Sequence, residues 1–263
     1  MLRRWLPVLT VLILLATACA QDDTTTAGSV GSSTTQPPPT AVTTTPAAPI
    51  TIMAIGEGIT QGEVGNSTYR CFLDAMLHDA GVTFDFVGSR QEPQDGEVDE
   101  YGCPTDFDPD HEAWFGAVAG GMETQKMTES VEALQPDVAL IHLGGTDIWR
   151  QGDPVGAAER LGSFITDLQA MNPDITLLIG TMIPCRTPLP WCIEDYPVFN
   201  DAVASFGDLS TDDSTVVVVD MQTGMSTDLL RSNNLSFTDE GNTLMAARWM
   251  AALEESGAIS TGS

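Results

Sequence analysis

The fold is decided by the stretch IMAIGEGITQG, residues 52–62. An apolar run that stops at a glycine-spaced turn is typical of a buried parallel strand that delivers a loop to the edge of its sheet. In α/β folds, the carboxyl end of the first strand commonly carries the chemistry. We therefore expect the turn Gly56-Glu57-Gly58 to lie at the functional edge of the sheet.

Strand-like and helix-like segments alternate along the rest of the chain. Strands are predicted at 83–87, 137–143, 175–180 and 216–219, and helices at 67–80, 122–134, 154–170, 194–206 and 239–253. Strict alternation favours a parallel sheet that is covered by helices on both faces. The predicted fold class is α/β, a three-layer α/β/α sandwich with a five-stranded parallel, flavodoxin-like sheet.

The first predicted helix has an apolar face and a polar face. Ser67 can cap its start, and Gly81 can end it. Arg70, Asp74 and His78 lie four residues apart on the polar side. This spacing predicts a solvated ladder of charges on the helix surface.

A long irregular stretch, 88–121, carries the acidic sequence DFDPDHE at 106–112. Its alternating carboxylates raise the hypothesis of a calcium site. The loop lacks the glycine and the closing glutamate of an EF-hand at their required spacing. A solvated acidic loop without a metal is therefore the expectation.

The N-terminal region has the pattern of an exported lipoprotein. Arg3 and Arg4 precede a short apolar run, and small residues then lead to Cys19, which would be lipidated. The alternative is an ordinary secretory signal with an incidental cysteine. We expect a signal peptide at 1–18, a disordered Thr/Ser/Pro-rich linker at 19–49 and a single domain at 50–258. The predicted location is the outer face of a bacterial cytoplasmic membrane, through the lipid anchor.

The chain is strongly acidic, with 10 Lys+Arg against 37 Asp+Glu and a net charge of −27. Without the predicted signal peptide, the net charge would be about −29. A field of this sign repels polyanions, which excludes a nucleic-acid partner. The composition is also typical of a protein that stays soluble in salt.

Four cysteines follow Cys19, and an even number in an exported domain predicts two disulfides. Cys185 and Cys192 flank a short, proline-stiffened segment and form the natural local pair. This leaves Cys71 to pair with Cys103. A zinc site is the competing interpretation, but no histidine is suitably spaced with the cysteines. No cofactor is expected.

Several motifs share one order along the chain: the strand and turn at 52–62, STYR at 67–70, FDFVGS at 84–89, DPDHE at 108–112 and LQPD at 134–137. Together they resemble the SGNH (GDSL) hydrolases, and within them the acetyl xylan esterase branch, which deacetylates polysaccharides. The resemblance covers almost the whole domain. Such enzymes use a serine nucleophile, an Asp-x-x-His pair, and an oxyanion hole formed by the serine and glycine N–H groups with an asparagine side chain.

The resemblance implies that most of these chemical groups are replaced in this sequence. The nucleophile position is Gly58, and the oxyanion glycine is kept as Gly116. Thr146 takes the place of the asparagine. In the last block, Asn233 replaces the aspartate and Ser236 replaces the histidine. A glycine cannot form an acyl-enzyme.

Other residues could substitute for the missing groups, but none forms a recognisable triad. Thr60 lies two positions past the missing serine, so its side chain should point elsewhere. His142 is interpreted as a satisfied core histidine, and His111 as part of a loop motif. Glu57 could act as a general base for water, although an exposed turn glutamate is the simpler reading.

The sequence therefore predicts a non-catalytic relative of carbohydrate esterases. Its cleft would bind a glycan or an acylated envelope component, and no catalytic residue set is intact. The predicted cleft residues are Glu57, Gly58, Gly116, Thr146, Asp147, Asn233 and Ser236. Two alternatives remain: an active esterase or deacetylase on acetylated polysaccharide or small esters with a rearranged site, and a purely structural envelope protein.

Overall fold

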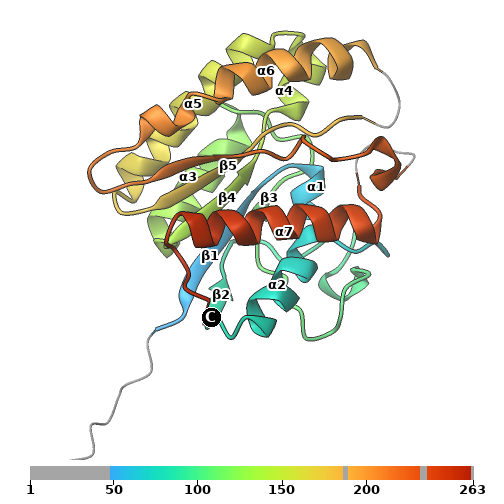
Figure 1. Cartoon of the computed structure of the whole chain (residues 1–263), viewed down its shortest axis with the longest axis vertical. Coiled ribbons are helices and arrows are strands. Elements are labelled where there is room, and N and C mark those ends of the chain that lie inside the picture. Colours follow the sequence, from blue (N-terminus) through green and yellow to red (C-terminus); the bar gives the residue numbers. More distant parts are fainter. Residues whose placement is uncertain (1–47, 186–188, 232–235, 262–263) are drawn as a thin grey trace, which may run out of the picture. The chain divides into compact units, whose positions relative to one another are not determined.

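The central sheet is parallel, and five of its strands lie side by side in the computed structural model, which describes residues 48–185, 189–231 and 236–261. The strands are β1 (Ile50–Gly56), β2 (Phe84–Phe86), β4 (Val138–His142), β5 (Thr176–Gly180) and β6 (Val216–Val219), in the order β2-β1-β4-β5-β6 (Figure 1). A sixth, β3 (Glu112–Ala113), pairs with the end of β1. The predicted five-stranded parallel sheet is confirmed, with this short addition.

Helices cover both faces of the sheet, as a three-layer sandwich requires (Figure 1). Apolar residues of α3 (Met122–Leu134), α4 (Gly145–Gln151), α5 (Pro154–Met171) and α6 (Tyr196–Val203) form the core on one face. Those of α2 (Tyr69–Asp79) and α7 (Asp239–Glu255) form the core on the other. The two-sided burial explains why the strands are almost wholly apolar.

Short turns of helix complete the domain. They are α1 (Gly58–Gln61), η1 (Val98–Glu100), η2 (Trp191–Asp195), η3 (Phe206–Leu209) and η4 (Thr227–Leu229). Of all the helices, α1 and α4 matter most for function, because each begins directly after a strand at the carboxyl edge of the sheet. Neither was expected, since four and seven residues are too short to show helical periodicity in the sequence.

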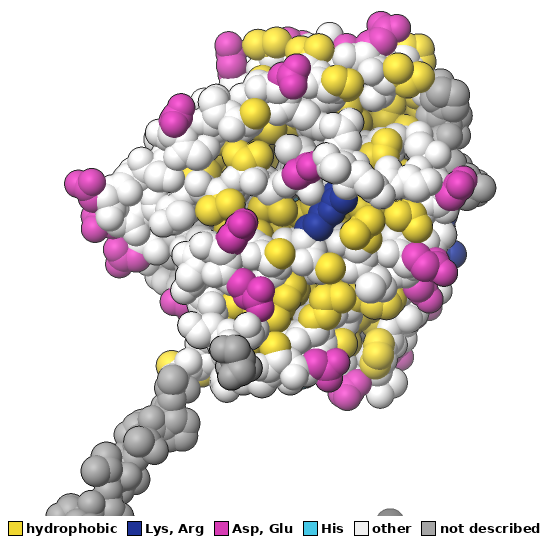
Figure 2. All heavy atoms as spheres, viewed as in Figure 1, with side chains coloured by type: hydrophobic (Ala, Val, Ile, Leu, Met, Phe, Trp, Pro, Cys, Tyr) yellow, Lys and Arg dark blue, Asp and Glu magenta, His cyan; other side chains and the backbone are white. Residues whose placement is uncertain are grey.

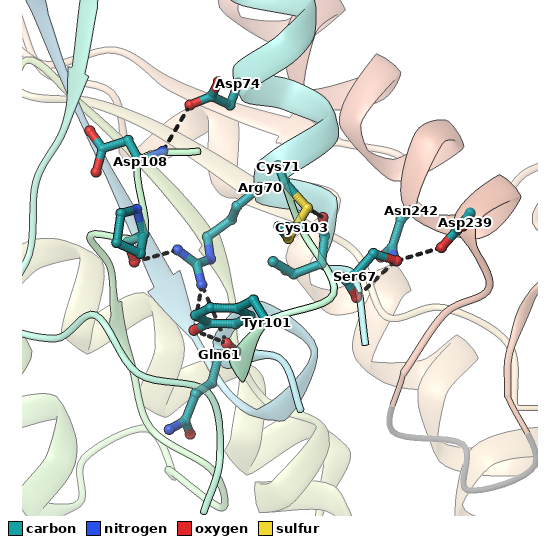
Figure 3. The surroundings of a disulfide bond; sticks show 12 residues. Gln61, Ser67, Arg70, Cys71, Asp74, Tyr101, Cys103, Asp108, Asp239 and Asn242 are labelled. Carbon is teal, nitrogen blue, oxygen red and sulfur yellow. Dashed lines mark hydrogen bonds between the residues drawn. A yellow bond between two sulfur atoms is a disulfide. The ribbon is translucent and has the colours of Figure 1, made fainter. Parts of the chain in front are cut away.

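Ser67 does not cap the first long helix, which corrects the prediction. That helix, α2, begins at Tyr69, and its N-cap residue, Thr68, makes no side-chain capping bond. The Ser67 hydroxyl instead donates to Asp239 Oδ1 at 2.5 Å, and Asn242 Nδ2 donates to Ser67 Oγ at 3.0 Å (Figure 3). Ser67 therefore ties the start of α2 to the start of α7.

The predicted solvated charge ladder on α2 is also wrong. Arg70 is 0% exposed and Asp74 is buried, and only the His78 side chain reaches solvent. Figure 3 shows Arg70 extending from α2 toward Tyr101 and Gln61. The polar face of this helix is covered by the long loop instead of water.

Backbone carbonyls and one hydroxyl accept the hydrogen bonds of the buried guanidinium of Arg70. Its Nε donates to Thr60 O at 2.9 Å, and Nη1 donates to the carbonyls of Pro109 and Asp110 at 2.7 and 3.4 Å. Nη2 donates to Gln61 O and to the Tyr101 hydroxyl at 3.3 and 2.8 Å. All five N–H groups of Arg70 thus have acceptors, and the side chain joins the turn after β1 to the acidic loop.

The acidic loop is not simply solvated, contrary to expectation. Asp108 accepts backbone N–H groups from Phe86 and Asp110, and Asp74 accepts the N–H of Asp108 at 3.2 Å. Glu112 is fully buried and accepts the N–H of Ser89 and the indole Nε1–H of Trp114. These carboxylates satisfy loop backbone groups, so they serve the architecture.

Two cysteine pairs fix the loops in the predicted pairing. Cys71 pairs with Cys103, with the Cα atoms 5.9 Å apart, and Cys185 pairs with Cys192, with the Cα atoms 6.0 Å apart. The first pair anchors the acidic loop to α2 (Figure 3). The second closes a short segment that follows β5.

The surface is rich in acidic side chains, as expected from the excess of Asp and Glu over Lys and Arg in the sequence. On the face that presents α7, Asp and Glu side chains are spread widely, while Lys and Arg show as one patch near the centre and a spot at the right edge (Figure 2). Residues 1–47, with the predicted signal peptide and Cys19, lie outside the described part of the chain. Within the described ranges, no helix is long and apolar enough to cross a membrane.

Candidate functional site

A pocket of about 260 Å³ lies at the carboxyl edge of the sheet, where β1, β4 and β5 end. It is built from four loops that follow strands, as expected for this class of sheet. Its lining comprises Glu57, Gly58, Ile59, Phe115, Gly116, His142, Gly145, Thr146, Trp149, Arg150, Met182, Ile183, Pro184, Cys185, Leu189, Trp191 and Tyr196. Most of this surface is apolar or aromatic, with a few polar groups among it.

The structure brings four of the predicted cleft residues together in this pocket: Glu57, Gly58, Gly116 and Thr146. Asp147 is 0% exposed and lies outside the lining, where its carboxylate accepts from Ala119 N and Arg160 Nε. Ser236 is buried and is also absent from the lining. Asn233 lies outside the described residues.

Glu57 is not an exposed turn residue. Its Oε1 accepts the N–H of Gly144 at 2.8 Å, and its Oε2 accepts the N–H of Thr146 at 2.9 Å together with the Thr146 hydroxyl. Burial raises the pKa of Glu57 to about 7, although these three hydrogen bonds act in the opposite direction. Both carboxylate oxygens therefore bind the start of α4.

Gly58, where the resemblance predicts the nucleophile, contains no reactive group and lies beside the ring of Phe115. A Cβ atom on Gly58 would lie 3.0 Å from the ring of Phe115, which is 48% exposed. The N–H groups of Gly58 and Gly116 have no hydrogen-bond acceptor in the described part of the chain. Two of the donors that would form an oxyanion hole are thus present and free.

The third donor of such a hole is missing from the pocket. At Thr146, where the family resemblance predicts an asparagine, the hydroxyl donates to Glu57. A short side chain that is committed to this carboxylate cannot also donate to a ligand. The replacement therefore changes the direction of the hydrogen bond as well as the residue type.

His142 is buried but not satisfied, which corrects the sequence interpretation. It is 5% exposed and lines the pocket, yet its Nε2 has no hydrogen-bond partner among the described residues. Burial lowers the pKa of His142 to about 4, although the nearby backbone of Thr181 acts in the opposite direction. The imidazole is consequently neutral at physiological pH.

His111 and Thr60 do not serve the pocket. His111 Nδ1 accepts the N–H of Ala113 at 3.0 Å, and its Nε2 lies 3.1 Å from the carbonyl of Glu92. Burial holds the pKa of His111 well below its usual range. Thr60 is fully buried, with its hydroxyl 3.4 Å from that of Tyr69. Both residues hold the loops in place.

Sequence reasoning missed the walls of the pocket. Phe115, Trp149, Trp191 and Tyr196 supply aromatic surface, and Arg150 adds a cation. The side chain of Arg150 forms no hydrogen bond or ion pair with any described residue, and its Nη2 would lie 3.0 Å from a Cβ on Gly116. The only signal in the sequence was a tryptophan and an arginine shortly after Thr146 and Asp147, in the helix α4, which is too short to show helical periodicity.

The pocket lacks the ligands for a bound metal. In the residues that the structure describes, no group of three or more His, Cys, Asp or Glu side chains could hold a metal ion. The calcium hypothesis for the acidic loop therefore gains no support. What the pocket offers is free backbone N–H groups, one unpaired imidazole and apolar walls.

Solved structures with the same fold include carbohydrate esterases as well as GDSL-like lipases and acylhydrolases. A carbohydrate esterase family 3 protein from Talaromyces cellulolyticus superposes with a TM-score of 0.69 and 22% identity, over 80% of this chain and 100% of that one. A family 3 carbohydrate esterase from Clostridium thermocellum gives 0.65 and 22%, over 82% and 100%. A mutant acetyl esterase with an acetate ion gives 0.67 and 23%, over 78% and 97%.

Sequence comparison gives the same relationship. A multidomain esterase from Ruminococcus flavefaciens is 29% identical over 152 residues, which are 52% of this chain but 19% of that protein. The chain thus matches about a fifth of that relative's length. The GDSL-like lipase/acylhydrolase family model matches residues 54–244, from β1 into α7. The chain therefore belongs to the GDSL-like lipase/acylhydrolase family.

Proposed function

We propose that this domain binds an acylated carbohydrate or a related envelope component without cleaving it, as a non-catalytic relative of carbohydrate esterases. One observation carries the proposal. At the nucleophile position the pocket has Gly58 packed against Phe115, while the N–H groups of Gly58 and Gly116 remain free. The pocket thus keeps donors for an acyl oxygen and lacks the atom that would attack the acyl carbon.

The expected loss of hydrolytic rate is large enough to support a binding role. Removing the serine or the histidine of a serine hydrolase triad alone lowers the rate by about a millionfold. This sequence replaces both, along with the orienting aspartate. The remaining donors can still stabilise a bound acyl oxygen, because hydrogen bonding to a carbonyl needs no nucleophile.

The walls of the pocket fit an acyl group attached to a sugar. Met182, Ile183 and Leu189 offer apolar contact for the acyl methyl, and aromatic rings are common surfaces for sugar rings. The acetyl esterase mutant that shares this fold contains an acetate ion. This ion is a reason to test acetylated ligands first.

The test is calorimetric titration of the domain with acetylated xylo-oligosaccharides and with the same oligosaccharides after chemical deacetylation. We expect tighter binding of the acetylated form and no release of acetate during the titration. Equal binding of the two forms would count against recognition of the acyl group. No binding of either form would favour a purely structural role.

An active esterase with a rearranged site is the second candidate, because burial brings the pKa of Glu57 to about 7, a useful value for a general base. Against it, three donors already occupy both oxygens of this carboxylate. Acetyl-ester hydrolysis above background, abolished by Glu57→Gln, would establish this alternative.

We also propose that the protein is exported and anchored through a lipid on Cys19. The support is the order of charged, apolar and small residues before this cysteine. In a bacterial host, the full chain should partition into detergent and incorporate labelled fatty acid, and Cys19→Ala should do neither. An unlabelled wild-type chain released to the medium would contradict the anchor.

A further inference from the structure

The pocket carries an exposed positive charge that no residue of the described chain neutralises. Arg150 lines the pocket from the last turn of α4, and its side chain forms no hydrogen bond or ion pair with any described residue. The other arginines in the described ranges all donate a side-chain hydrogen bond to the chain: Arg70, Arg90, Arg160, Arg231 and Arg248. Arg150 is thus set apart in a chain whose net charge is −27.

The guanidinium of Arg150 lies in space that Gly116 leaves open. A Cβ on Gly116 would lie 3.0 Å from Arg150 Nη2, so a side chain at this position would collide with the arginine. The N–H of Gly116 has no acceptor in the described part of the chain. Arg150 therefore places a second, charged donor beside a backbone donor at the wall of the pocket.

The lining of the pocket is less acidic than the chain as a whole. Among the described residues, Glu57 is its only carboxyl group, and burial raises the pKa of Glu57 to about 7. Both oxygens of Glu57 accept hydrogen bonds from the start of α4, and neither pairs with Arg150. His142 is neutral, because burial lowers its pKa to about 4. Of the described lining residues, only Arg150 therefore stays fully charged at neutral pH.

We propose that the pocket prefers a carbohydrate that carries a carboxylate, as in a uronic acid, with this carboxylate bound by Arg150. The inference rests on the proposed function, since it assumes that a carbohydrate enters the pocket. A planar guanidinium presents paired N–H donors that match the two oxygens of a carboxylate. The step is binding only, and no bond is broken.

The residue beside Arg150 supplies a surface for the sugar ring. Trp149 also lines the pocket and is 60% exposed, and the centre of its ring lies 6.0 Å from Arg150 Cζ. A sugar ring that packs on the indole would bring its own carboxylate toward the guanidinium. The pair on α4 thus offers apolar contact and charge side by side, as an acidic sugar requires.

A carboxylate suits this site better than a phosphate. Arg150 is the only Lys or Arg among the described lining residues, so it balances one negative charge. A phosphate monoester carries a charge of about −1.5 to −2 at pH 7. The excess would be repelled by the acidic chain around the pocket. A singly charged uronate avoids this cost.

The ligand side of the test separates the acyl group from the carboxylate. Methyl glucoside, methyl glucuronoside and the 2-O-acetyl form of each are titrated into the wild-type protein at low salt and followed by NMR. We expect the carboxylate to tighten binding about two- to fivefold in both pairs, which is the effect of one exposed ion pair. The acetyl group should tighten binding independently, as the proposed function requires.

The protein side uses Arg150→Met, with Lys126→Met as the matched control. Lys126 is exposed on α3 and absent from the pocket, and its removal changes the net charge by the same amount. The gain from the carboxylate should disappear in Arg150→Met and remain in Lys126→Met. Circular dichroism establishes that both variants fold. If Arg150→Met does not fold, the Nε–H signal of Arg150 in the wild type decides, because it must shift with methyl glucuronoside and not with methyl glucoside.

The outcomes distinguish the inference from the proposed function. If the acetyl group tightens binding and the carboxylate does not, the inference is wrong and acyl binding stands. If the carboxylate tightens binding and the acetyl group does not, acyl recognition fails while the role of Arg150 stands. If none of the four sugars binds, both proposals fail.

Three further results would overturn the role of Arg150 or the choice of carboxylate. A gain from the carboxylate that persists in a folded Arg150→Met, or an Nε–H signal that does not shift, shows that Arg150 does not bind it. An equal loss in Lys126→Met shows that net charge alone sets the preference. Tighter binding of methyl glucoside 6-phosphate than of methyl glucuronoside would show that the site is built for a phosphate.

Discussion

Two sets of polar groups lie near the end of β1, and they differ in how completely they are satisfied. Around Arg70, every N–H of a buried guanidinium has an acceptor, most of them backbone carbonyls. In the pocket, His142 Nε2 and Arg150 have no hydrogen-bond or ion-pair partner in the described chain. The difference teaches that the first set maintains the fold, whereas the second leaves polar groups at the pocket without a partner among the described residues.

The largest expected effect comes from breaking the satisfied set. Arg70→Met removes five donors and leaves buried carbonyls without partners, so the free energy of unfolding should fall by about 3–5 kcal/mol. Arg150→Met is the matched control, since this exposed arginine has no partner to lose, and it should change stability by less than about 0.5 kcal/mol. Urea unfolding measures both. If both variants lose the same unfolding free energy, the hydrogen bonds of Arg70 do not make it more important for stability than Arg150.

The two disulfides give the next comparison. Cys71 and Cys103 are 32 residues apart beside Arg70, and Cys185 and Cys192 are 7 apart at the pocket. From the chain entropy of the unfolded state, replacing both cysteines by serine should cost about 3–4 kcal/mol in the first case and about 2 kcal/mol in the second. Thermal unfolding of the two double variants ranks them. A reversed order would mean that the pocket wall is stabilised more strongly than the acidic loop.

Glu57 shares features of both sets, since it lines the pocket but is fully hydrogen-bonded. Glu57→Gln replaces one acceptor oxygen by a donor facing backbone N–H groups, which should cost about 1–3 kcal/mol. It should also change how stability depends on pH. Because the folded pKa is about 7 and the ordinary value is 4.5, the contribution from protonation is complete below pH 4.5 and is lost as the pH rises to 7.

The stabilisation that wild type loses as Glu57 ionises amounts to at most about 3 kcal/mol. Other buried carboxyls titrate as well, so the measurement is the difference between wild type and Glu57→Gln in urea unfolding from pH 4.5 to pH 8. The wild-type advantage should shrink across this range. A constant difference would show that Glu57 is ionised throughout this range and that its folded pKa is not raised toward 7.

The smallest effect is expected at the nucleophile position. Gly58→Ser brings a Cβ to 3.0 Å from the Phe115 ring, which is half exposed and can move, so stability should change by less than about 1 kcal/mol. Gly116→Ala should cost more, about 1–2 kcal/mol, because its φ is +75° and Arg150 crowds it. Gly58→Ser alone should show no esterase activity, since a serine without a base is a weak nucleophile.

The fold was predictable because apolar strands and amphipathic helices leave periodic patterns. Polar residues were harder to place. Arg70 lies at a polar position of its helix, but a loop far away in sequence covers that position, and spacing along the helix cannot reveal this. The same limit applies to Asp147, whose carboxylate binds Ala119 and Arg160 and lies outside the pocket.

The candidate site was predicted in part. Glu57, Gly58, Gly116 and Thr146 were identified because they follow motif order, and the structure brings them together. The aromatic walls and Arg150 were missed because they come from loops and a short helix without periodicity. The unpaired state of His142 was missed for a different reason, since hydrogen-bond satisfaction is a property of three-dimensional neighbours.

The central claim is that this family member binds without covalent chemistry, and one assay tests it most directly. Release of acetate from acetylated xylo-oligosaccharide is measured for the wild-type domain beside the variant Gly58→Ser, Thr146→Asn, Asn233→Asp, Ser236→His. We predict background rates for the wild type and measurable hydrolysis for the variant, which would restore the serine, its base and the third oxyanion donor. Wild-type hydrolysis above background that is lost in Glu57→Gln would contradict the account.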